Sequence, residues 1–167
     1  MAKADVTAQR LREFLHYDAD TGVFTWIVDR SPKTRRGDVA GSIYSNGYRM
    51  IGIDWKYTSA HRLAWLYVHG KMPETWIDHI NGDKTDNRIA NLRDVPPSMN
   101  SQNQRRPHAD KTSCRLMGAT WDKMWGNWKA QLRLKGRTIY LGRFKTAEEA
   151  HQAYLEGKRR LHEGCTV

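Results

Sequence analysis

The sequence predicts an α+β fold divided between two small domains. Residues 76–103 read as strand, turn-rich loop, strand and helix, and residues 117–161 read as three strands followed by one helix. A polar stretch that contains Pro107 and lacks apolar periodicity lies between them. In the second domain, the three antiparallel strands would pack on the helix. We expect a first domain, a linker and a second domain at residues 1–104, 105–115 and 116–167.

Length and charge limit the kind of protein that this chain can be. A chain of 167 residues holds one domain or two small ones, which excludes a large multidomain enzyme. Its mean hydropathy of −0.79, without a long apolar run, argues against a membrane span. Residues 1–104 carry 14 Lys and Arg and 12 Asp and Glu, a net charge of +2, whereas residues 105–167 carry 14 and 6, a net charge of +8. The positive charge is therefore concentrated in the second domain.

The cysteines and the N-terminal residues indicate a reducing compartment. Cys114 and Cys165 form no CxxC pair, which argues against a cysteine zinc site. The first residues lack the apolar core of a signal peptide. We therefore expect a cytoplasmic protein.

Short elements open the first domain. Residues 9–15 place apolar side chains at helical spacing, and residues 22–28 and 47–54 are strand-like. Ser59 suits the N-cap of a helix that ends near Gly70 and has one apolar face. We expect this helix to pack in the core.

A dense polar segment follows this helix. Residues 76–95 are rich in Asp, Asn and His but keep isoleucine, leucine and valine. We expect strands at 77–80 and 92–95, joined by a loop, and then a helix that begins at Pro96-Pro97 and carries Asn100. This mixture indicates a polar site mounted on a small hydrophobic frame.

The polar residues suit hydrolysis assisted by a metal ion. A hard cation such as Mg²⁺ can use few protein oxygen ligands, so Asp78 with the amide carbonyl of Asn100 could suffice. A histidine beside such an ion can accept a proton from water near neutral pH, which makes His79 the candidate base. Neighbours on a flat strand point to opposite faces, so joint use of Asp78 and His79 requires a bulge or a strand end.

These residues resemble the HNH nucleases, and within them the phage and intron-encoded group whose third motif residue is Asn. The resemblance runs from about Leu11 to Gln104. It is carried by Ser59–Ala64, Asp78–Asp83, Asn87–Arg93, and Asn100 with Asn103. It implies a ββα-metal fold and a DNA endonuclease that uses Mg²⁺ or Mn²⁺. By the same resemblance, His79 is the general base, Asp78 and Asn100 are the metal ligands, and Asn91 orients the histidine ring.

The resemblance also implies products with 5′-phosphate and 3′-hydroxyl ends. One metal site and one base attack one strand at a time, so we expect a monomer to nick the duplex. Asn103 and His61 carry over as supporting residues, and for His61 helix packing and a phosphate contact are both open. Many relatives hold a structural zinc with cysteine pairs, which this chain lacks, so its core must stabilise the domain.

Four other polar residues of the loop have a simpler interpretation. Asn and Asp most often serve turns and caps, because their side chains bond nearby backbone groups. We expect this role for Asn81, Asp83, Asp86 and Asn87.

The second domain has a strand with one apolar and one basic face. In residues 128–134, tryptophan and aliphatic side chains alternate with Lys129, Gln131 and Arg133. Residues 135–137 form a turn signal before a returning strand, and the helix that follows can cover the apolar face. The basic face would stay exposed, with the width and donors to enter a major groove.

Residues 118–164 resemble the apetala-two/ethylene-response-factor DNA-binding domain. The resemblance is carried by Gly118, Trp128, Ala130, residues 140–144, residues 146–150, Ala153 and Tyr154. It implies core positions at Trp128, Phe144 and Tyr154, and DNA contacts at Trp121, Lys129, Arg133, Lys135, Arg137 and Arg143. Thr120 and Asp122 stand where plant members often have Arg, so base preference does not carry over.

Together the two halves predict a phage or mobile-element DNA endonuclease that acts on duplex DNA in a bacterial host cytoplasm. The first alternative is a sequence-specific DNA-binding regulator whose nuclease motif is inactive. The second is an RNA-binding or RNA-cutting protein, which competition between duplex DNA and RNA would distinguish because an A-form major groove is too narrow for a sheet.

Overall fold

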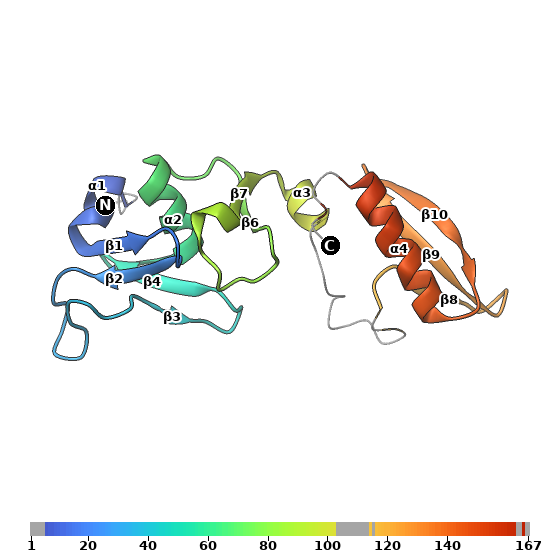
Figure 1. Ribbon diagram of the computed structural model, residues 1–167, viewed down its shortest axis with the longest axis horizontal. Helices are drawn as coiled ribbons and strands as arrows, with labels where there is room; N and C mark the ends of the chain where they lie inside the picture. The colour runs from blue at the N-terminus through green and yellow to red at the C-terminus, as the bar shows by residue number, and fades with distance from the viewer. Residues whose placement is uncertain (1–5, 103–113, 115, 163–164, 166–167) are drawn as a thin grey trace. The chain divides into compact units, whose positions relative to one another are not determined.

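The computed structural model describes residues 6–102, 114, 116–162 and 165. The chain divides into two compact units, residues 1–96 and 97–167 (Figure 1). Small antiparallel sheets and few helices make up both units, which confirms the predicted α+β class. None of the helices in this described part has the length and apolar character to cross a membrane.

The predicted domain limits differ from this division. The units separate between Pro96 and Pro97, so α3 (Pro97–Gln102) is grouped with the second unit rather than with residues 1–96. Most of the predicted linker lies outside the described residues. The assignment of a nuclease domain, a linker and a DNA-binding domain to these segments stays a prediction.

Over its described residues, 6–96, the first unit has three small antiparallel sheets and two helices. The helices are α1 (Ala8–Phe14) and α2 (Ala60–His69). The sheets comprise β1 (Leu15–Asp18) with β2 (Val23–Trp26), β3 (Ser42–Ile43) with β4 (Arg49–Ile53) and β5 (Lys56–Ser59), and β6 (Trp76–His79) with β7 (Leu92–Val95). A single 3-10 turn, Ile89–Asn91, precedes β7.

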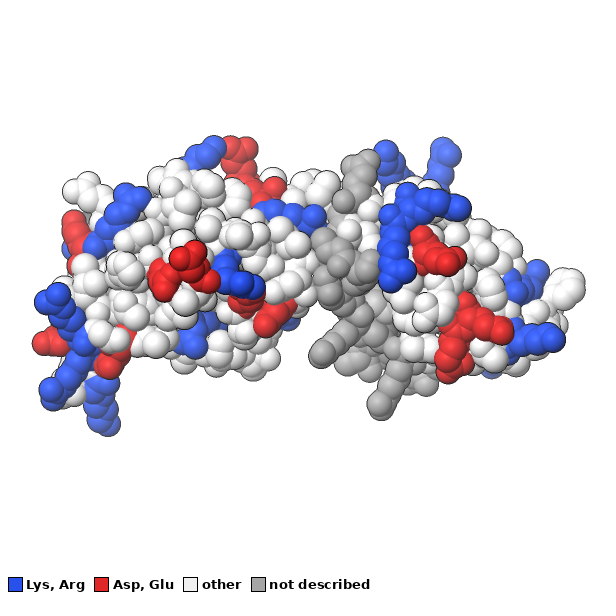
Figure 2. All heavy atoms as spheres, in the orientation of Figure 1, with Lys and Arg blue, Asp and Glu red and all other residues white. Residues whose placement is uncertain are grey.

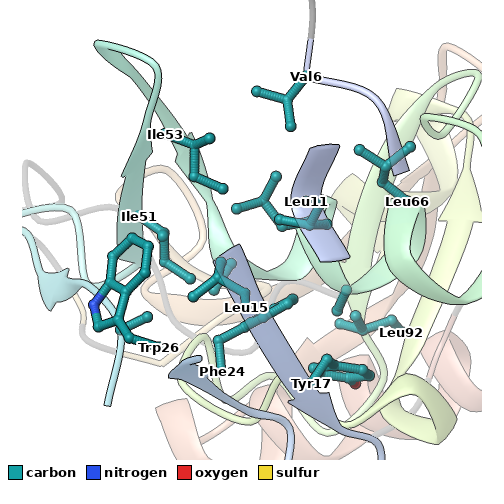
Figure 3. Packing of buried hydrophobic residues seen from close by; sticks show 14 of the residues in the cluster. Val6, Leu11, Leu15, Tyr17, Phe24, Trp26, Ile51, Ile53, Leu66 and Leu92 are labelled. Carbon is teal, nitrogen blue, oxygen red and sulfur yellow. The ribbon is translucent and has the colours of Figure 1, made fainter. Parts of the chain in front are cut away.

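The core of this unit joins the N-terminal elements to β7. Leu11 of α1 and Leu15 of β1 are fully buried, and Leu66 of α2 and Leu92 of β7 belong to the same apolar cluster (Figure 3). Burial of aliphatic and aromatic side chains provides the main driving force for folding such a unit. This cluster supports the polar β6–β7 segment.

Several predicted elements are confirmed in the first unit. The helix over 9–15, the helix after Ser59 and the two strands that flank the polar loop are all present. β1 was not predicted, because its residues directly follow α1 and share the buried Leu15 with the helical pattern. β5, a short strand that turns into α2 at Ser59, was not predicted either.

The second unit is a three-stranded sheet in the order β10-β9-β8, against which a long helix packs. Its elements after α3 are β8 (Ala119–Asp122), β9 (Asn127–Leu134), β10 (Arg137–Phe144) and α4 (Ala147–Leu161). Thr146 and Glu149 form a capping box at the start of α4. Gly157 allows α4 to approach the sheet, since a Cβ there would lie 2.8 Å from a Leu141 methyl carbon.

Candidate active site and nucleic-acid interface

Asp78 and His79 end the strand β6 and are both buried. The two residues are 6% and 4% exposed, in contrast to the exposed Trp76 at the start of the strand. His79 is the last residue of β6 and pairs with Leu92, and the Gly82 N–H donates to its carbonyl in the turn that follows. The strand end that the joint use of Asp78 and His79 requires is therefore present.

Asp78 forms an ion pair across the β6–β7 ladder. Arg93 lies directly opposite Asp78, and its Nε and Nη2 donate to the Asp78 Oδ2 at 2.9 and 2.7 Å. A buried carboxylate needs such a partner, because its charge would otherwise be poorly solvated. The sequence analysis did not assign a role to Arg93.

Asn91 ties the loop between the two strands together. Its Nδ2 donates to the Asn81 Oδ1 at 3.0 Å and to the Asp86 carbonyl at 2.8 Å, and its Oδ1 accepts from the Asn81 N–H at 2.9 Å. Asp83 caps the same loop by accepting from the Thr85 N–H and hydroxyl. This part of the loop is a closed network of short polar side chains.

The ring of His79 contacts Asn87 rather than the predicted Asn91. The His79 Nε2 lies 3.2 Å from the Asn87 Oδ1, and Asn87 is only 2% exposed. Burial lowers the pKa of His79, against the smaller opposing effects of Asn87 and of the nearby acidic residues. Asn87, expected only to serve a turn, is therefore placed within the candidate site.

His61 and Tyr48 complete the surroundings of His79. The His61 ring meets the His79 ring edge-on at 5.1 Å, and the Tyr48 ring centroid lies 5.0 Å from His61 and 6.0 Å from His79. Burial lowers the pKa of His61 to about 3, with smaller contributions from His79 and Arg62. His61 thus packs within the site as an uncharged ring, and the sequence analysis missed Tyr48.

The other predicted metal ligand, Asn100, and the predicted supporting residue Asn103 follow β7 in the sequence. Asn100 is a partly buried residue of α3, which belongs to the second unit. Asn103 lies outside the described residues. Among those that the structure describes, no group of three or more His, Cys, Asp and Glu side chains could hold a metal ion. The Asp78 and Asn100 ligand pair stays a prediction.

In the second unit, the register separates the predicted DNA contacts into two faces. Lys129 pairs with Thr120 and Arg143, so these side chains share the face that points away from α4 with Arg133, four residues further along β9. Trp121 pairs with Trp128 on the other face, with ring centroids 5.4 Å apart. Trp121 therefore lies on the opposite face of the sheet from Arg133.

The other two predicted contacts lie at the β9–β10 turn. Lys135 and Gly136 have positive φ angles of 48° and 81°, as the first and second residues of a tight hairpin turn do. Arg137 follows at the exposed start of β10, opposite Leu134. On the helix side, shown in Figure 2, acidic and basic side chains of α4 are mixed. The sheet face away from α4 is the better candidate for binding DNA.

Two exposed aromatic residues join Arg143 on that face or at its edge. The Arg143 guanidinium lies 4.7 Å from the ring centroid of Trp125 and 5.8 Å from that of Tyr140. Trp125 and Tyr140 are 61% and 54% exposed. The sequence analysis missed both, although an exposed aromatic beside arginine is a common signal for nucleic-acid binding.

Comparison with known proteins relates the segment that contains this site to a family of nucleases. Residues 58–102 match the family model of HNH endonucleases, a segment that includes Asp78, His79, Asn91 and Asn100. This segment of the chain is therefore similar to the HNH endonucleases. Protein 3.8 of Escherichia phage T7 is 29% identical over 84 residues, which cover 50% of this chain and 68% of that protein. No solved structure matches. The family model ends before β8, so the apetala-two resemblance stays a prediction.

Proposed function

We propose that this protein is a metal-dependent DNA endonuclease of the phage or mobile-element type. The observation that carries the proposal is the HNH endonuclease match over residues 58–102, within which His79 is buried at a strand end beside Asp78. The reaction is hydrolysis of a phosphodiester in duplex DNA. We expect a monomer to nick one strand at a time.

His79 is the general base in this proposal. The lowered pKa leaves the imidazole unprotonated at neutral pH, so one ring nitrogen can take a proton from the attacking water. The surrounding rings of His61 and Tyr48 hold the imidazole in one place. Asn91 supports this geometry from a distance by fixing the loop through Asn81 and Asp86.

Asp78 and Asn100 are the proposed metal ligands. Their carboxylate and amide oxygens are the donors that Mg²⁺ or Mn²⁺ accepts, and the donor set leaves room for water and phosphate oxygens. A bound cation would stabilise negative charge on the phosphate and on the leaving 3′ oxygen. Arg93 already holds the Oδ2 of Asp78, which orients the carboxylate.

The basic sheet face of the second unit supplies DNA affinity in this proposal. Lys129, Arg133 and Arg143 would contact phosphates and base edges, and Lys135 and Arg137 would add contacts at the turn. Trp121 would reach DNA only from the edge of the sheet, since its register places it on the helix side. The affinity should fall steeply with salt concentration because phosphate contacts release counterions.

A DNA-binding regulator with an inactive nuclease motif is the alternative, and one contact favours it. Arg93 pairs with an oxygen of the Asp78 carboxylate, the group that would have to bind the metal ion. The plasmid experiment below separates the two, since a regulator would bind DNA without cutting it.

Supercoiled plasmid is the substrate that tests the proposal. The full-length protein should convert it to nicked circles with Mg²⁺ or Mn²⁺ and leave it intact with a chelator. DNA ligase should reseal the nicks, because 5′-phosphate and 3′-hydroxyl ends are expected. A gel shift without cleavage, on plasmid and on phage and host DNA, would favour the regulator.

A further inference from the structure

The β4–β5 ribbon carries an exposed tryptophan at its tip. Ile53 pairs with Lys56, so the turn between the two strands consists of Asp54 and Trp55 alone. Trp55 is 91% exposed. An indole that stays in water forgoes the favourable free energy that its burial would provide. The first unit therefore gains little packing from this large apolar side chain.

The backbone of this turn is also unfavourable for tryptophan. Asp54 and Trp55 have φ angles of 49° and 63°. Two-residue turns with two positive φ angles favour Asn or Asp first and Gly second, because a Cβ is crowded in the left-handed region. The β9–β10 turn of the same chain follows this rule, with Gly136 as its second residue. Trp55 thus occupies a glycine position at a conformational cost that burial does not offset.

Arg10 holds this turn in place from α1. Its Nε and Nη2 donate to the two carboxylate oxygens of Asp54 at 2.9 and 3.0 Å, which is a bidentate geometry. The same guanidinium lies 4.3 Å from the centroid of the Phe14 ring. Two parallel hydrogen bonds fix orientation as well as distance. The indole of Trp55 is therefore presented from an anchored turn.

A basic loop lies beside the turn. Arg30, at the start of this loop between β2 and β3, lies 5.4 Å from the centroid of the same Phe14 ring. The pKa of Asp54 is lowered, chiefly by hydrogen bonds from Arg10 and also by the charge of Arg30, which indicates that Arg30 is near the turn. The loop, residues 30–36, has four basic side chains and no acidic one. Figure 2 shows basic side chains at the place that this loop has in Figure 1.

Hydrogen bonds to its backbone give the basic loop a defined shape. The Arg35 N–H donates to the Asp38 Oδ2 at 2.7 Å. The Arg36 N–H donates to the Asp29 Oδ1 at 2.9 Å. Lys33, Arg35 and Arg36 are exposed. Exposed cations beside an exposed indole match the chemistry of nucleic acid, which presents phosphates and flat apolar bases.

We propose that the β4–β5 turn and the basic loop form a docking surface of the first unit for duplex DNA. Trp55 inserts against the base pairs as an apolar wedge, and Lys33, Arg35 and Arg36 bind phosphates. This surface goes beyond the proposed function, which assigns DNA affinity to the second unit. Its place on the substrate rests on the proposed nuclease function, but its binding of DNA does not.

Substitution of Trp55 separates binding from folding. In gel shifts of the full chain with a chelator present, Trp55→Gly should weaken affinity for duplex DNA by about 5- to 100-fold, as expected for the loss of one aromatic side chain stacked on a base. It should unfold at an equal or higher urea concentration than wild type, because Gly favours this turn position. Trp55→Tyr keeps a ring and should keep most of the affinity. Unchanged affinity in Trp55→Gly, or a parallel loss of affinity and stability, would overturn the proposal.

Trp76 provides a matched control, because it is another exposed indole of the first unit, at the start of β6. Trp76→Ala should leave affinity for duplex DNA unchanged, and a loss equal to that of Trp55→Gly would contradict the assigned location. Single-stranded DNA and RNA of the same length test the partner. If Trp55→Gly weakens binding to either of these but not to duplex DNA, the proposed partner is wrong.

The phosphate contacts predict a change in salt dependence. The double variant Arg35→Gln with Arg36→Gln keeps the backbone N–H groups that Asp38 and Asp29 bind, so the loop should keep its shape. The slope of log affinity against log salt concentration should become less steep by about 1.8, because each phosphate contact contributes about 0.9. An unchanged slope would contradict the phosphate contacts.

The ribbon also predicts where this surface meets the substrate. Tyr48 precedes β4 and His61 follows β5, so both lie at the end of the ribbon opposite Trp55, beside His79. Five residues of an antiparallel strand span about 17 Å, the rise of about five base pairs. On one side of the nick, duplexes that end within about five base pairs of it should bind wild type and Trp55→Gly alike.

An effect of Trp55→Gly that persists on duplexes shortened from both sides would contradict this placement. Binding that depends on Trp55 without any cleavage by wild type would refute the nuclease function and leave the docking surface in place.

Discussion

At the scale of single residues, the candidate site is a set of buried polar side chains with partners. Asp78, His79, Asn87 and Asn91 are each less than 10% exposed, and each makes hydrogen bonds that compensate the loss of water. Such a network has little freedom to rearrange, because breaking one bond leaves a buried polar atom unsatisfied. The geometry around His79 is therefore set before DNA arrives.

The buried imidazole of His61 predicts a loss of stability in weak acid. Its pKa of about 3 lies below the ordinary value of 6.5, so the unfolded chain takes up a proton that the folded chain excludes. From about pH 7 to about pH 5, this difference should cost roughly 1–2 kcal/mol of the free energy of unfolding. The stability is present above the unfolded pKa and is lost as the pH falls. Urea unfolding at both pH values measures the change.

His61→Gln is the variant that isolates this effect. The lowered pKa of His79 acts in the same direction, so part of the acid sensitivity should remain in the variant. The carboxylates take up protons mainly below this window. If the free energy of unfolding falls by the same amount between the two pH values in His61→Gln and in wild type, His61 is not the source of the acid sensitivity.

The residue types of the site could be predicted from the sequence, but their partners could not. Asp78 and His79 are adjacent in a strand-like segment, but neighbours on a flat strand point to opposite faces, so their spacing alone did not establish the strand end that the structure places at His79. Asn87 and Asn91 lie in one turn-rich loop. The sequence alone does not show which of the two side chains contacts the ring of His79. The fold of the loop decides, since Asn91 turns toward Asn81 and Asp86 while Asn87 turns toward His79.

At the scale of elements, the β1–β2 hairpin supports the loop that carries Asn87. Gly22 has a φ of +73°, and its missing side chain lets the hairpin touch the Asn87–Arg88 peptide. Gly22→Ala should therefore destabilise the protein by well over 1 kcal/mol, because it adds a clash with backbone to an unfavourable φ. Denaturant unfolding measures the change.

Gly37 offers a matched control for this substitution. Its φ is +92°, but a Cβ there would meet nothing within 4 Å. Gly37→Ala should cost only the backbone part, about 1 kcal/mol. Equal destabilisation by the two substitutions would show that contact between the hairpin and the loop contributes little.

The sheet of the second unit predicts different effects for two basic residues of β9. Arg133 is exposed and has a guanidinium fork that can contact a guanine edge, whereas Lys129 has a single ammonium suited to phosphate. Arg133→Ala should change the preferred cleavage sites, and Lys129→Ala should weaken binding to all sequences alike. Mapping nicks on a long DNA with each variant tests this. A uniform loss of affinity in both would make β9 a phosphate-binding strand.

A strand with a clear alternating pattern could be predicted together with its buried face, whereas strands that run on from or into a helix were missed. In β9, the alternation of Ala130 and Leu132 with Lys129, Gln131 and Arg133 indicated both the strand and its buried face. The same register also places Trp121 on the helix side, which a family resemblance alone does not reveal. β1 shares Leu15 with the helical pattern of α1, and β5 runs directly into α2 at Ser59, so neither strand stands apart from its neighbouring helix.

At the scale of the whole molecule, charge and chemistry are divided along the chain. Residues 1–104 have a net charge of +2 and contain the HNH segment, whereas residues 105–167 have a net charge of +8. Phosphate contacts dominate affinity for DNA and depend on such positive charge. The second part should therefore supply affinity and the first part the reaction.

Removal of residues 107–167 tests this division. The shortened chain should need a higher DNA concentration for half-maximal cleavage and show a weaker dependence of binding on salt, with a maximal rate close to that of the full chain. Titrations at several salt concentrations measure both quantities. Undiminished affinity in the shortened chain would refute the division of labour.

The central claim is that His79 performs the reaction and does not hold the DNA. The most direct measurement compares nicking and gel-shift affinity for wild type, His79→Ala and His69→Ala, in the presence of Mg²⁺. His69 lies at the end of α2 beside Trp65 and serves as the control. We expect His79→Ala to bind DNA as wild type does but no longer to cut it, and His69→Ala to do both. Cleavage that survives in His79→Ala, or that is lost together with binding, would contradict it.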